Sequence, residues 1–189
     1  MRGPQPADVL GRVTLVTGKE EFLNERTVAS VRAAVRGHDA EAEQAETTAG
    51  DLSLAVLGEL SAASLFSSTR CVVVRGLEQL PDESVEGLVS YCAAPVEDVA
   101  LVLVHGGGQK GSGLLAKLRT LGTETEVKSA ELKGAEFPRF VSAEVRTHGA
   151  TIEDDAAGFL VQAVGQDLRS LSAAAHQLAN DFASARPPK

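Results

Sequence analysis

Hydrophobic residues in the first part of this chain form short apolar runs that alternate with longer amphipathic stretches. Three runs are strongly apolar and have the length of buried strands: Val13 to Val16, Cys71 to Val74 and Val99 to Val104. Weaker runs at 38–46 and 124–127 also fit strands, the first with an Ala/Glu alternation typical of a sheet edge. Helices are predicted where apolar residues recur three and four positions apart, at about 20–36, 52–60, 80–92 and 114–121.

The run Val99 to Val104 indicates how the strands are arranged. It is apolar at consecutive rather than alternate positions, so helices must cover both faces of the strand and the sheet is mostly parallel. Five strands alternating with helices predict a doubly wound α/β domain with a five-stranded sheet. We expect residues 1–11 to be loose, Gly37 to end the first helix, and Asp51 or Gly50 to cap the second.

The pattern changes after Lys133 and Gly134, where amphipathic stretches follow one another without a strand between them. Three short helices are predicted here, the third with Asp167 as its N-cap. The buried face of the second helix is expected to comprise Phe159, Leu160, Ala163 and Val164. The chain is therefore expected to form an α/β domain at residues 1–133 and a small three-helix lid domain at 134–189.

Composition and charge limit the possible classes of function. Of the 189 residues, 43% are hydrophobic and 23% are charged, which is ordinary for a globular protein with its own core. The net charge of −8 argues against a free-standing binder of duplex DNA, which needs basic residues to neutralise phosphates. No apolar run approaches the roughly 20 residues that span a bilayer. The N-terminus has no apolar signal segment, so we expect a cytoplasmic protein.

An α/β domain followed by a helical lid suggests nucleotide binding, which would need a Gly-x-x-x-x-Gly-Lys-Ser/Thr loop between a strand and a helix. After the first strand, the stretch Thr17 to Phe22 has one Gly and places two carboxylates where phosphate would lie. The Gly-rich stretch 106–113 also fails, because Ser112 stands where the pattern requires Lys. The strand before it ends at His105, without the acidic pair that would hold Mg²⁺. The sequence thus predicts a flexible Gly-rich loop there and no ATP site.

Other reactive side chains form no recognisable catalytic or metal-binding set. The His residues are scattered, and Cys71 and Cys92 fit small hydrophobic residues. The carboxylate pairs at 20–21 and 154–155 fall at predicted helix starts, where capping and the helix dipole account for them. Arg169, in the lid, is expected to make structural or intersubunit contacts. We expect no catalytic residues, no metal and no cofactor.

The segment Ser61 to Thr69 carries two large apolar residues, Leu65 and Phe66, among Ser, Ala and Thr. Local sequence favours burial of this pair, because most apolar side chains are buried. The alternative is a plug that stands out from the surface and enters a pocket on a partner. The residues of the segment alone leave both interpretations open.

The order of these motifs resembles the delta subunit of the bacterial DNA polymerase III clamp loader. The resemblance rests on the strand with Gly-x-Glu and Phe-Leu at 13–23, on Ser64-Leu65-Phe66 followed by 70–76, and on 137–141 and 165–171 in the lid. It implies an AAA+-like fold that has lost nucleotide binding, which agrees with the missing phosphate loop. The family's third, C-terminal collar domain is missing from this sequence.

By this resemblance, the chain binds the ring-shaped sliding clamp (the beta subunit) and helps to open it for loading on primed DNA, without hydrolysing ATP itself. Leu65 and Phe66 would enter a hydrophobic pocket on the clamp, with Ser64 and Ser67 as flanking contact candidates. The other implied partners are the delta prime and gamma/tau loader subunits, and primed DNA only within the assembled loader. The chain would thus be a non-catalytic subunit of a DNA-directed DNA polymerase holoenzyme, with no membrane contact.

Two alternative functions are open at this point. An active AAA+ ATPase would need the missing Gly-Lys-Ser/Thr, so the sequence argues against it. An α/β interaction protein with an unrelated partner would share the predicted fold and the missing phosphate loop. Binding of the clamp by the native chain, and its loss when Leu65 and Phe66 are replaced, would separate this alternative from the clamp-loader function.

Overall fold

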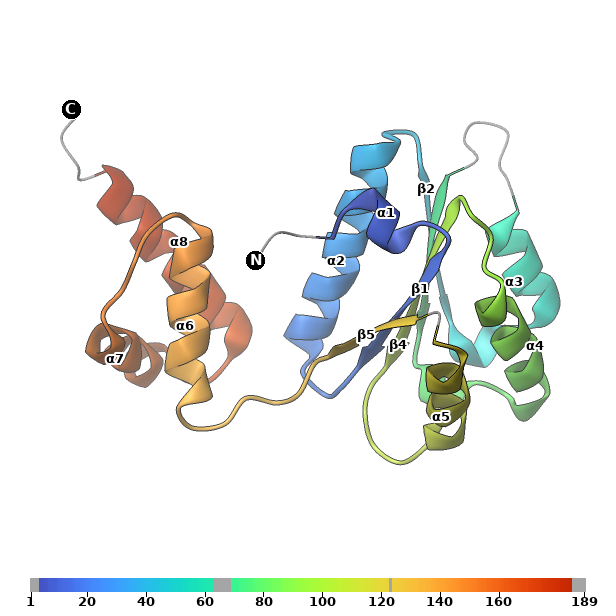
Figure 1. The fold of residues 1–189 in the computed structure, drawn as a ribbon. Helices are drawn as coiled ribbons and strands as arrows, with labels where there is room; N and C mark the ends of the chain where they lie inside the picture. The colour runs from blue at the N-terminus through green and yellow to red at the C-terminus, as the bar shows by residue number, and fades with distance from the viewer. Residues whose placement is uncertain (1–3, 63–68, 123, 185–189) are drawn as a thin grey trace. The chain divides into compact units, whose positions relative to one another are not determined.

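The computed structural model describes residues 4–62, 69–122 and 124–184, which form two compact units that divide between Glu131 and Leu132. The first unit is a sheet with helices on both faces, and the second consists of the helices α6, α7 and α8 (Figure 1). The predicted clamp-contact residues Ser64, Leu65, Phe66 and Ser67 lie outside the described residues. Within the described part of the chain, no helix combines the length and apolar character needed to cross a membrane.

Five strands form the sheet, in the order β2-β3-β4-β1-β5. Their bounds are Arg12–Thr17 (β1), Glu43–Thr48 (β2), Arg70–Arg75 (β3), Val99–His105 (β4) and Glu124–Lys128 (β5). Every pair is parallel, with Leu15 of β1 opposite Leu103 of β4, for example. The predicted doubly wound α/β fold is confirmed, with a sheet that is wholly parallel among the described strands. The edge strand predicted at 38–46 is β2, but it begins later, at Glu43, because α2 continues to His38.

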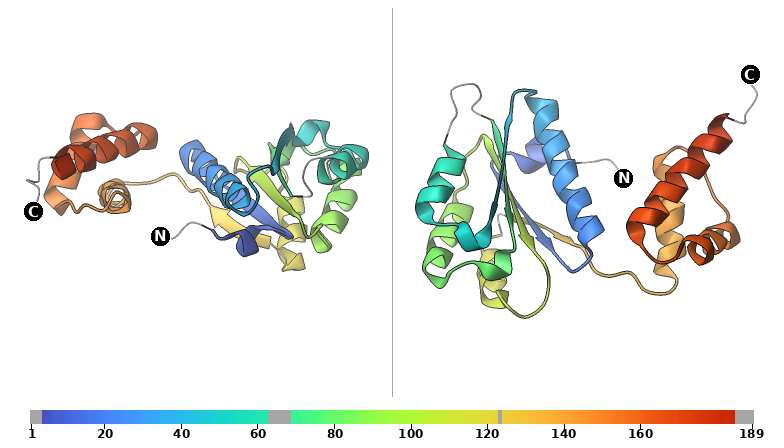
Figure 2. Two further views of the ribbon diagram at one scale, coloured as in Figure 1. Left: turned by 90° about the horizontal axis from the view of Figure 1, so that it is seen from above. Right: turned by 180° about the vertical axis from the view of Figure 1, so that it is seen from behind.

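Helices cover both faces of this sheet, as the views in Figures 1 and 2 show. Helices α1 (Pro6–Val9) and α2 (Glu21–His38) pack on one face. The other face carries α3 (Leu54–Ser61), α4 (Asp82–Ala93) and α5 (Ser112–Leu121). Short 3₁₀ turns follow β2 and β3, at Ala49–Asp51 (η1) and Leu77–Gln79 (η2). The connection after β1 thus crosses one face of the sheet, and the connection after β4 crosses the other.

The central strand β4 is buried along its whole length and divides the core in two. Odd-numbered residues such as Leu101 and Leu103 pack in the cluster under α3, α4 and α5. Even-numbered residues such as Val102 and Val104 pack in the cluster under α2. Because successive side chains of a strand point to opposite faces, a strand covered on both sides has to be apolar at every position.

Two predictions near the N-terminus were wrong. Residues 1–11, expected to be loose, include α1, because Val9 packs into the apolar cluster beneath α2. Gly37 does not end α2, which continues through this exposed position to His38. A single helical Gly costs about 1 kcal/mol, and packing of the rest of the helix offsets that cost.

The predicted cap of the helix after β2 was also wrong. Asp51 and Gly50 belong to the 3₁₀ turn that precedes α3. The N-cap is Ser53, whose hydroxyl accepts a hydrogen bond from the Val56 N–H at 3.2 Å. Several neighbouring residues can cap a helix, and the 3₁₀ turn places Ser53 at the N-cap position.

The second unit packs α6 (Glu136–Thr147), α7 (Asp154–Val164) and α8 (Leu168–Ser184) around a small core. The Asp167 carboxylate accepts a hydrogen bond from the Ser170 N–H at 2.8 Å, which confirms the predicted cap of α8. Hydrogen bonding to the side chain of Ser170, and next to its backbone, lowers the pKa of Asp167. Glu144 of α6 is 4% exposed, and its carboxylate accepts a hydrogen bond from the Ser172 hydroxyl of α8 at 2.6 Å. The core residues of this unit are Phe137, Val141, Val145, Ala157, Leu168, Leu171, Ala175 and Ala179.

The predicted buried face of α7 was wrong at Ala163, which is exposed, and most clearly at Phe159. That side chain is 69% exposed, whereas Ala157 is 0% exposed and packs inside. Helix α7 carries apolar residues on nearly every side, so its periodicity does not select one face. Packing against α6 and α8 therefore decides which face of α7 is buried.

Glu126 of β5 connects this strand to β1 and α5, so its substitution tests how much these contacts stabilise the first unit. Its carboxylate accepts hydrogen bonds from the Thr17 hydroxyl at 2.7 Å and from the Arg119 guanidinium at 2.7 and 3.0 Å. The Arg119 hydrogen bond, above all, lowers the pKa of Glu126 to about 2. We expect Glu126→Gln to lower the free energy of unfolding by about 1–2 kcal/mol at about pH 7, as measured by urea titration.

A lowered carboxyl pKa contributes stability above the pKa of the unfolded chain, and this contribution fades as the pH falls toward the folded-state value. The stability difference between Glu126→Gln and the native chain should therefore be smaller at about pH 3.5 than at about pH 7. Glu86→Gln is the control, because Glu86 pairs with Lys117 at an exposed position, and its effect should stay below about 0.5 kcal/mol. A loss from Glu126→Gln that is equal at both pH values would contradict this account.

Candidate functional site

The carboxyl ends of β1 and β4 lie side by side at a reversal in the sheet topology. From there the chain continues to helices on opposite faces, α2 after β1 and α5 after β4. In open α/β sheets, ligands bind at such a point because the diverging connections leave a crevice between them. The loops at 18–20 and 106–111 border it, so they are the places where a phosphate site would form.

The loop between β1 and α2 is hydrogen-bonded to the strands on either side of β1. The Gly18 N–H donates to the His105 carbonyl oxygen at 3.1 Å, and the Glu20 N–H donates to the Ser129 carbonyl oxygen at 3.1 Å. Gly18 has a φ of +144°, and a Cβ at this position would lie 2.0 Å from the Ser129 oxygen. Only glycine fits there. These two backbone donors are therefore engaged within the protein.

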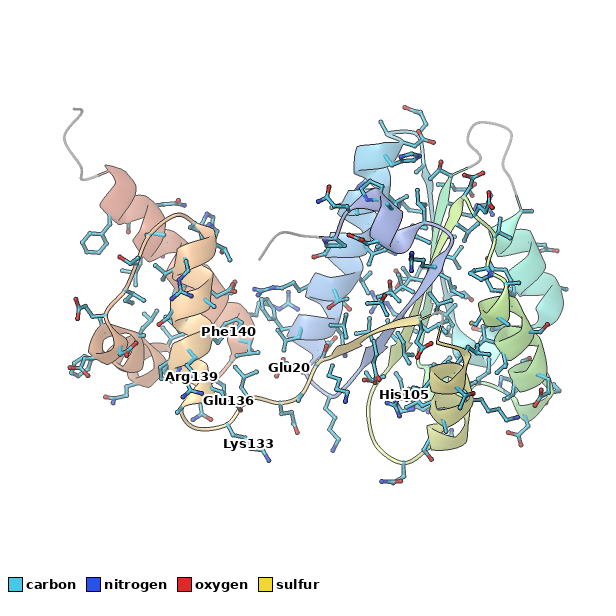
Figure 3. All side chains as sticks on the ribbon, viewed as in Figure 1. Glu20, His105, Lys133, Glu136, Arg139 and Phe140 are labelled. Atoms are coloured by element: carbon cyan, nitrogen blue, oxygen red, sulfur yellow. The ribbon has the colours of Figure 1, made fainter. Side chains whose placement is uncertain are left out.

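Helix α2 also begins with a negative charge of its own (Figure 3). The Glu20 carboxylate accepts a hydrogen bond from the Phe22 N–H at 3.3 Å, which confirms its predicted capping role. Phosphates bind helix N-termini through these same unpaired N–H groups and through the positive end of the helix dipole. A phosphate at α2 would compete with Glu20 for the Phe22 N–H and would be repelled by its charge.

A buried histidine organises the Gly-rich loop after β4. His105 is 0% exposed, and its Nδ1 accepts a hydrogen bond from the Gly107 N–H at 3.0 Å. Its Nε2 lies 2.8 Å from the Lys110 carbonyl oxygen. Because Nδ1 is an acceptor, Nε2 carries the hydrogen and donates it to Lys110. The ring therefore ties both ends of a loop that the sequence predicted to be flexible.

A second carboxylate, that of Glu78 in η2, lies against the same loop. Its Oε2 accepts a hydrogen bond from the Gly106 N–H at 3.0 Å. A Cβ at Gly111 would lie 3.0 Å from the Glu78 Cα, so the backbones of η2 and the loop are in close contact. The Phe22 N–H in the first turn of α2 and the Gly106 N–H of the second loop are thus each bound to a carboxylate of the chain itself, Glu20 or Glu78. A triphosphate would meet two negative charges there.

Both ends of the predicted clamp-binding segment are described, although residues 63–68 are not. The Arg70 guanidinium donates to the Glu59 carbonyl oxygen of α3 at 2.9 Å and to the Glu43 carboxylate of β2 at 2.5 Å. The Arg70 N–H also donates to the Asp98 carbonyl oxygen at 2.9 Å. Arg70 is 8% exposed and connects the last turn of α3 to the start of β3. The only feature of the sequence that marks Arg70 is a charge at the start of an apolar strand.

Among the other residues singled out from the sequence, two are buried thiols and three belong to the helical unit. Cys71 and Cys92 are buried, and desolvation raises the pKa of their thiols to about 11 and about 12, as expected of small core residues. Arg169 is exposed in the first turn of α8. His148 and His176 stack with ring centroids 4.3 Å apart. No cluster of His, Cys, Asp or Glu among the described residues has the geometry to hold a metal ion.

The role of His105 can be tested by substitution. His105→Ala would remove the acceptor for Gly107 and the donor for Lys110, and it would leave a cavity at a fully buried position. We expect a loss of about 2–4 kcal/mol in the free energy of unfolding and faster proteolysis within 106–111. His38→Ala, at the exposed end of α2, is the control and should change stability by less than about 0.5 kcal/mol. Equal proteolysis of the loop in native and His105→Ala proteins would contradict the assigned role.

Solved structures share this fold over nearly the whole chain. The Bacillus subtilis DNA clamp loader delta protein matches with a TM-score of 0.78 and 21% sequence identity, over 95% of this chain and 56% of that protein. A DNA polymerase III gamma subunit-related protein from Thermotoga maritima matches with a TM-score of 0.54 and 12% identity, over 95% of this chain and 57% of that protein. This chain therefore spans just over half the length of either structure.

The sequence itself matches no protein-family model and no curated protein. At identities of 21% and 12%, what the structural comparisons show is a common fold. The likeness to the delta protein extends over 95% of the chain, and so includes described parts of both the sheet unit and the helical unit. This chain has the fold of a clamp-loader delta protein, as the resemblance implied.

Proposed function

We propose that this chain comprises the α/β and lid domains of a clamp-loader delta subunit that binds a sliding clamp and helps to open it. The observation that carries the proposal is the fold shared with the clamp loader delta protein over 95% of the chain. The motif order that resembles the delta family, from the opening strand to Gly165-Gln166-Asp167, supports it independently of the fold.

Leu65 and Phe66 are the proposed contact, with Ser64 and Ser67 beside them. An apolar anchor that fills a pocket on the partner is the usual form of an interface hot spot. Opening the ring would then require no bond chemistry, because a subunit that binds the open clamp more tightly than the closed one shifts the balance toward opening. Arg70 supports this role, since it holds the chain at the base of the segment on both sides.

The proposed subunit binds no nucleotide. The loop after β1 is short and is bonded to its neighbours, and the carboxylates of Glu20 and Glu78 take backbone donors that a phosphate would need. ATP bound by other loader subunits would then control when the clamp contact is presented. The gamma/tau and delta prime subunits are the proposed partners, and primed DNA would be contacted only within the assembly, which is consistent with a net charge of −8.

The clamp contact is tested by the double substitution Leu65→Ser/Phe66→Ser. We expect the native chain to bind the sliding clamp of its own organism in surface plasmon resonance. The double variant should bind at least about 30-fold more weakly, because two hot-spot side chains are lost. Its far-ultraviolet circular dichroism and melting temperature should match those of the native chain if the pair is exposed.

Val96→Ser is the matched control, because Val96 is an apolar side chain of the same unit that is 45% exposed. It should leave clamp affinity within about twofold of the native value. The proposal fails if the native chain does not bind the clamp. It also fails if the folded double variant binds as tightly as the native chain.

Nucleotide binding can be tested separately by thermal unfolding with Mg-ATP. A site with a Kd of about 10 µM would stabilise the chain by about 2.7 kcal/mol at about 1 mM ligand. We expect no change in melting temperature, with a known ATP-binding protein as the positive control. A saturable rise in melting temperature would instead support the ATPase alternative.

A further inference from the structure

An apolar groove of about 490 Å³ lies within the helical unit, between α7, α8 and the connection from α6 to α7. Its wall includes Ile152, Leu160 and Leu178 as well as two aromatic residues, Phe159 and Phe182. All of these belong to one compact unit. The groove is therefore defined without reference to the placement of the sheet unit.

The two phenylalanines are the unusual feature of this groove. Phe159 is 69% exposed and Phe182 is 71% exposed, although each would favour burial by about 1.5–3 kcal/mol. Four lining residues of α7 follow the spacing of one helix face: Ala156, Phe159, Leu160 and Ala163. Exposed apolar surface gathered around a groove marks an interaction site more often than does a single exposed residue.

Carboxylates outnumber cations around the groove. Glu153 lines it, and the exposed carboxylates of Asp155 and Asp181 belong to residues that immediately precede the lining residues Ala156 and Phe182. The sequence contains no Lys or Arg from 150 to 163 or from 177 to 184. The nearest cation along the described helices is Arg146, which is exposed and follows the lining residue Val145 at the end of α6, so the three carboxylates face one cation.

We propose that this groove binds an amphipathic helix of a partner protein whose apolar stripe is flanked by Lys and Arg. A helix laid in a groove inserts side chains at i, i+3 or i+4, and i+7, and Phe159 and Phe182 offer contacts for such a stripe. Basic residues beside the stripe would face Glu153, Asp155 and Asp181, which favours such a helix over an acidic one. This groove belongs to the helical unit, whereas segment 64–67 belongs to the sheet unit, so the inference goes beyond the proposed clamp contact.

A second copy of this chain is a poorer occupant on electrostatic grounds. A symmetric contact would bring the same acidic rim against itself, and the chain as a whole carries a net charge of −8. Like charges brought together at an interface oppose association. The partner is therefore expected to be a different, basic protein surface.

The proposal is tested with a fluorescent peptide of about 18 residues, long enough for about five helical turns, with Leu on one face and Lys elsewhere. A matched peptide carries Glu in place of every Lys. In fluorescence anisotropy, the native chain should bind the Lys peptide at least about tenfold more tightly than the Glu peptide. Phe159→Ser/Phe182→Ser should weaken Lys-peptide binding by about tenfold or more. Because both side chains are exposed, the fold should be retained.

A second variant isolates the charge. Glu153→Gln/Asp155→Asn/Asp181→Asn should weaken Lys-peptide binding by about three- to tenfold and reduce its dependence on salt. Its control neutralises three exposed carboxylates of the other unit, Glu41→Gln/Glu83→Gln/Glu97→Gln. Val96→Ser is the control for the aromatic pair. Neither control should change affinity by more than about twofold.

Three results would overturn the proposal. The first is a failure of the peptide test: either the native chain does not bind the Lys peptide, or Phe159→Ser/Phe182→Ser binds it as tightly as the native chain does. The second is equal affinity for the Lys and Glu peptides, which would mean that the acidic rim does not select the partner. The third is a native dimer in sedimentation equilibrium that Phe159→Ser/Phe182→Ser converts to a monomer, since the occupant would then be a second copy. Each can occur whether or not the chain binds the sliding clamp.

Discussion

The central strand β4 imposes the main constraint on the first unit, because all of its side chains are buried. A strand without a solvent face needs a layer of helices on each side, and the chain supplies them as α2 on one side and α3, α4 and α5 on the other. The same strand delivers His105 to the carboxyl edge of the sheet. There the ring bonds to Gly107 and Lys110, so packing in the core also fixes the loop that follows.

At the carboxyl edge of the sheet, groups of the protein itself take up hydrogen-bond donors that a bound phosphate would need. The reversal between β1 and β4 lies where open α/β sheets bind ligands. Here the Gly18 N–H donates to the His105 carbonyl oxygen, and the carboxylates of Glu20 and Glu78 accept hydrogen bonds from the Phe22 N–H of α2 and the Gly106 N–H. Replacing an external anion by internal carboxylates satisfies the backbone and stabilises the loops, but it opposes the binding of a phosphate.

In the proposed function, binding depends on apolar side chains rather than on reactive groups. Segment 64–67 falls in the sequence between Glu59 and Arg70, and the Arg70 guanidinium donates a hydrogen bond to the Glu59 carbonyl oxygen. The groove with Phe159 and Phe182 belongs to the other unit. The two proposed surfaces therefore belong to different units of the chain.

Sequence periodicity determined the strands, the two-sided burial of the sheet, the helical module after Gly134 and the failure of the phosphate-loop pattern, because each depends on residues close together in the chain. Recognition of Leu65 and Phe66 as a candidate contact needed the motif order as well, since local pattern favoured their burial. Tertiary structure alone decided that Ala157 rather than Phe159 faces the core, that Glu78 reaches Gly106, and that Arg70 joins α3 to β2. These outcomes depend on which distant segments meet in space, and a local pattern of apolar and polar residues does not encode that.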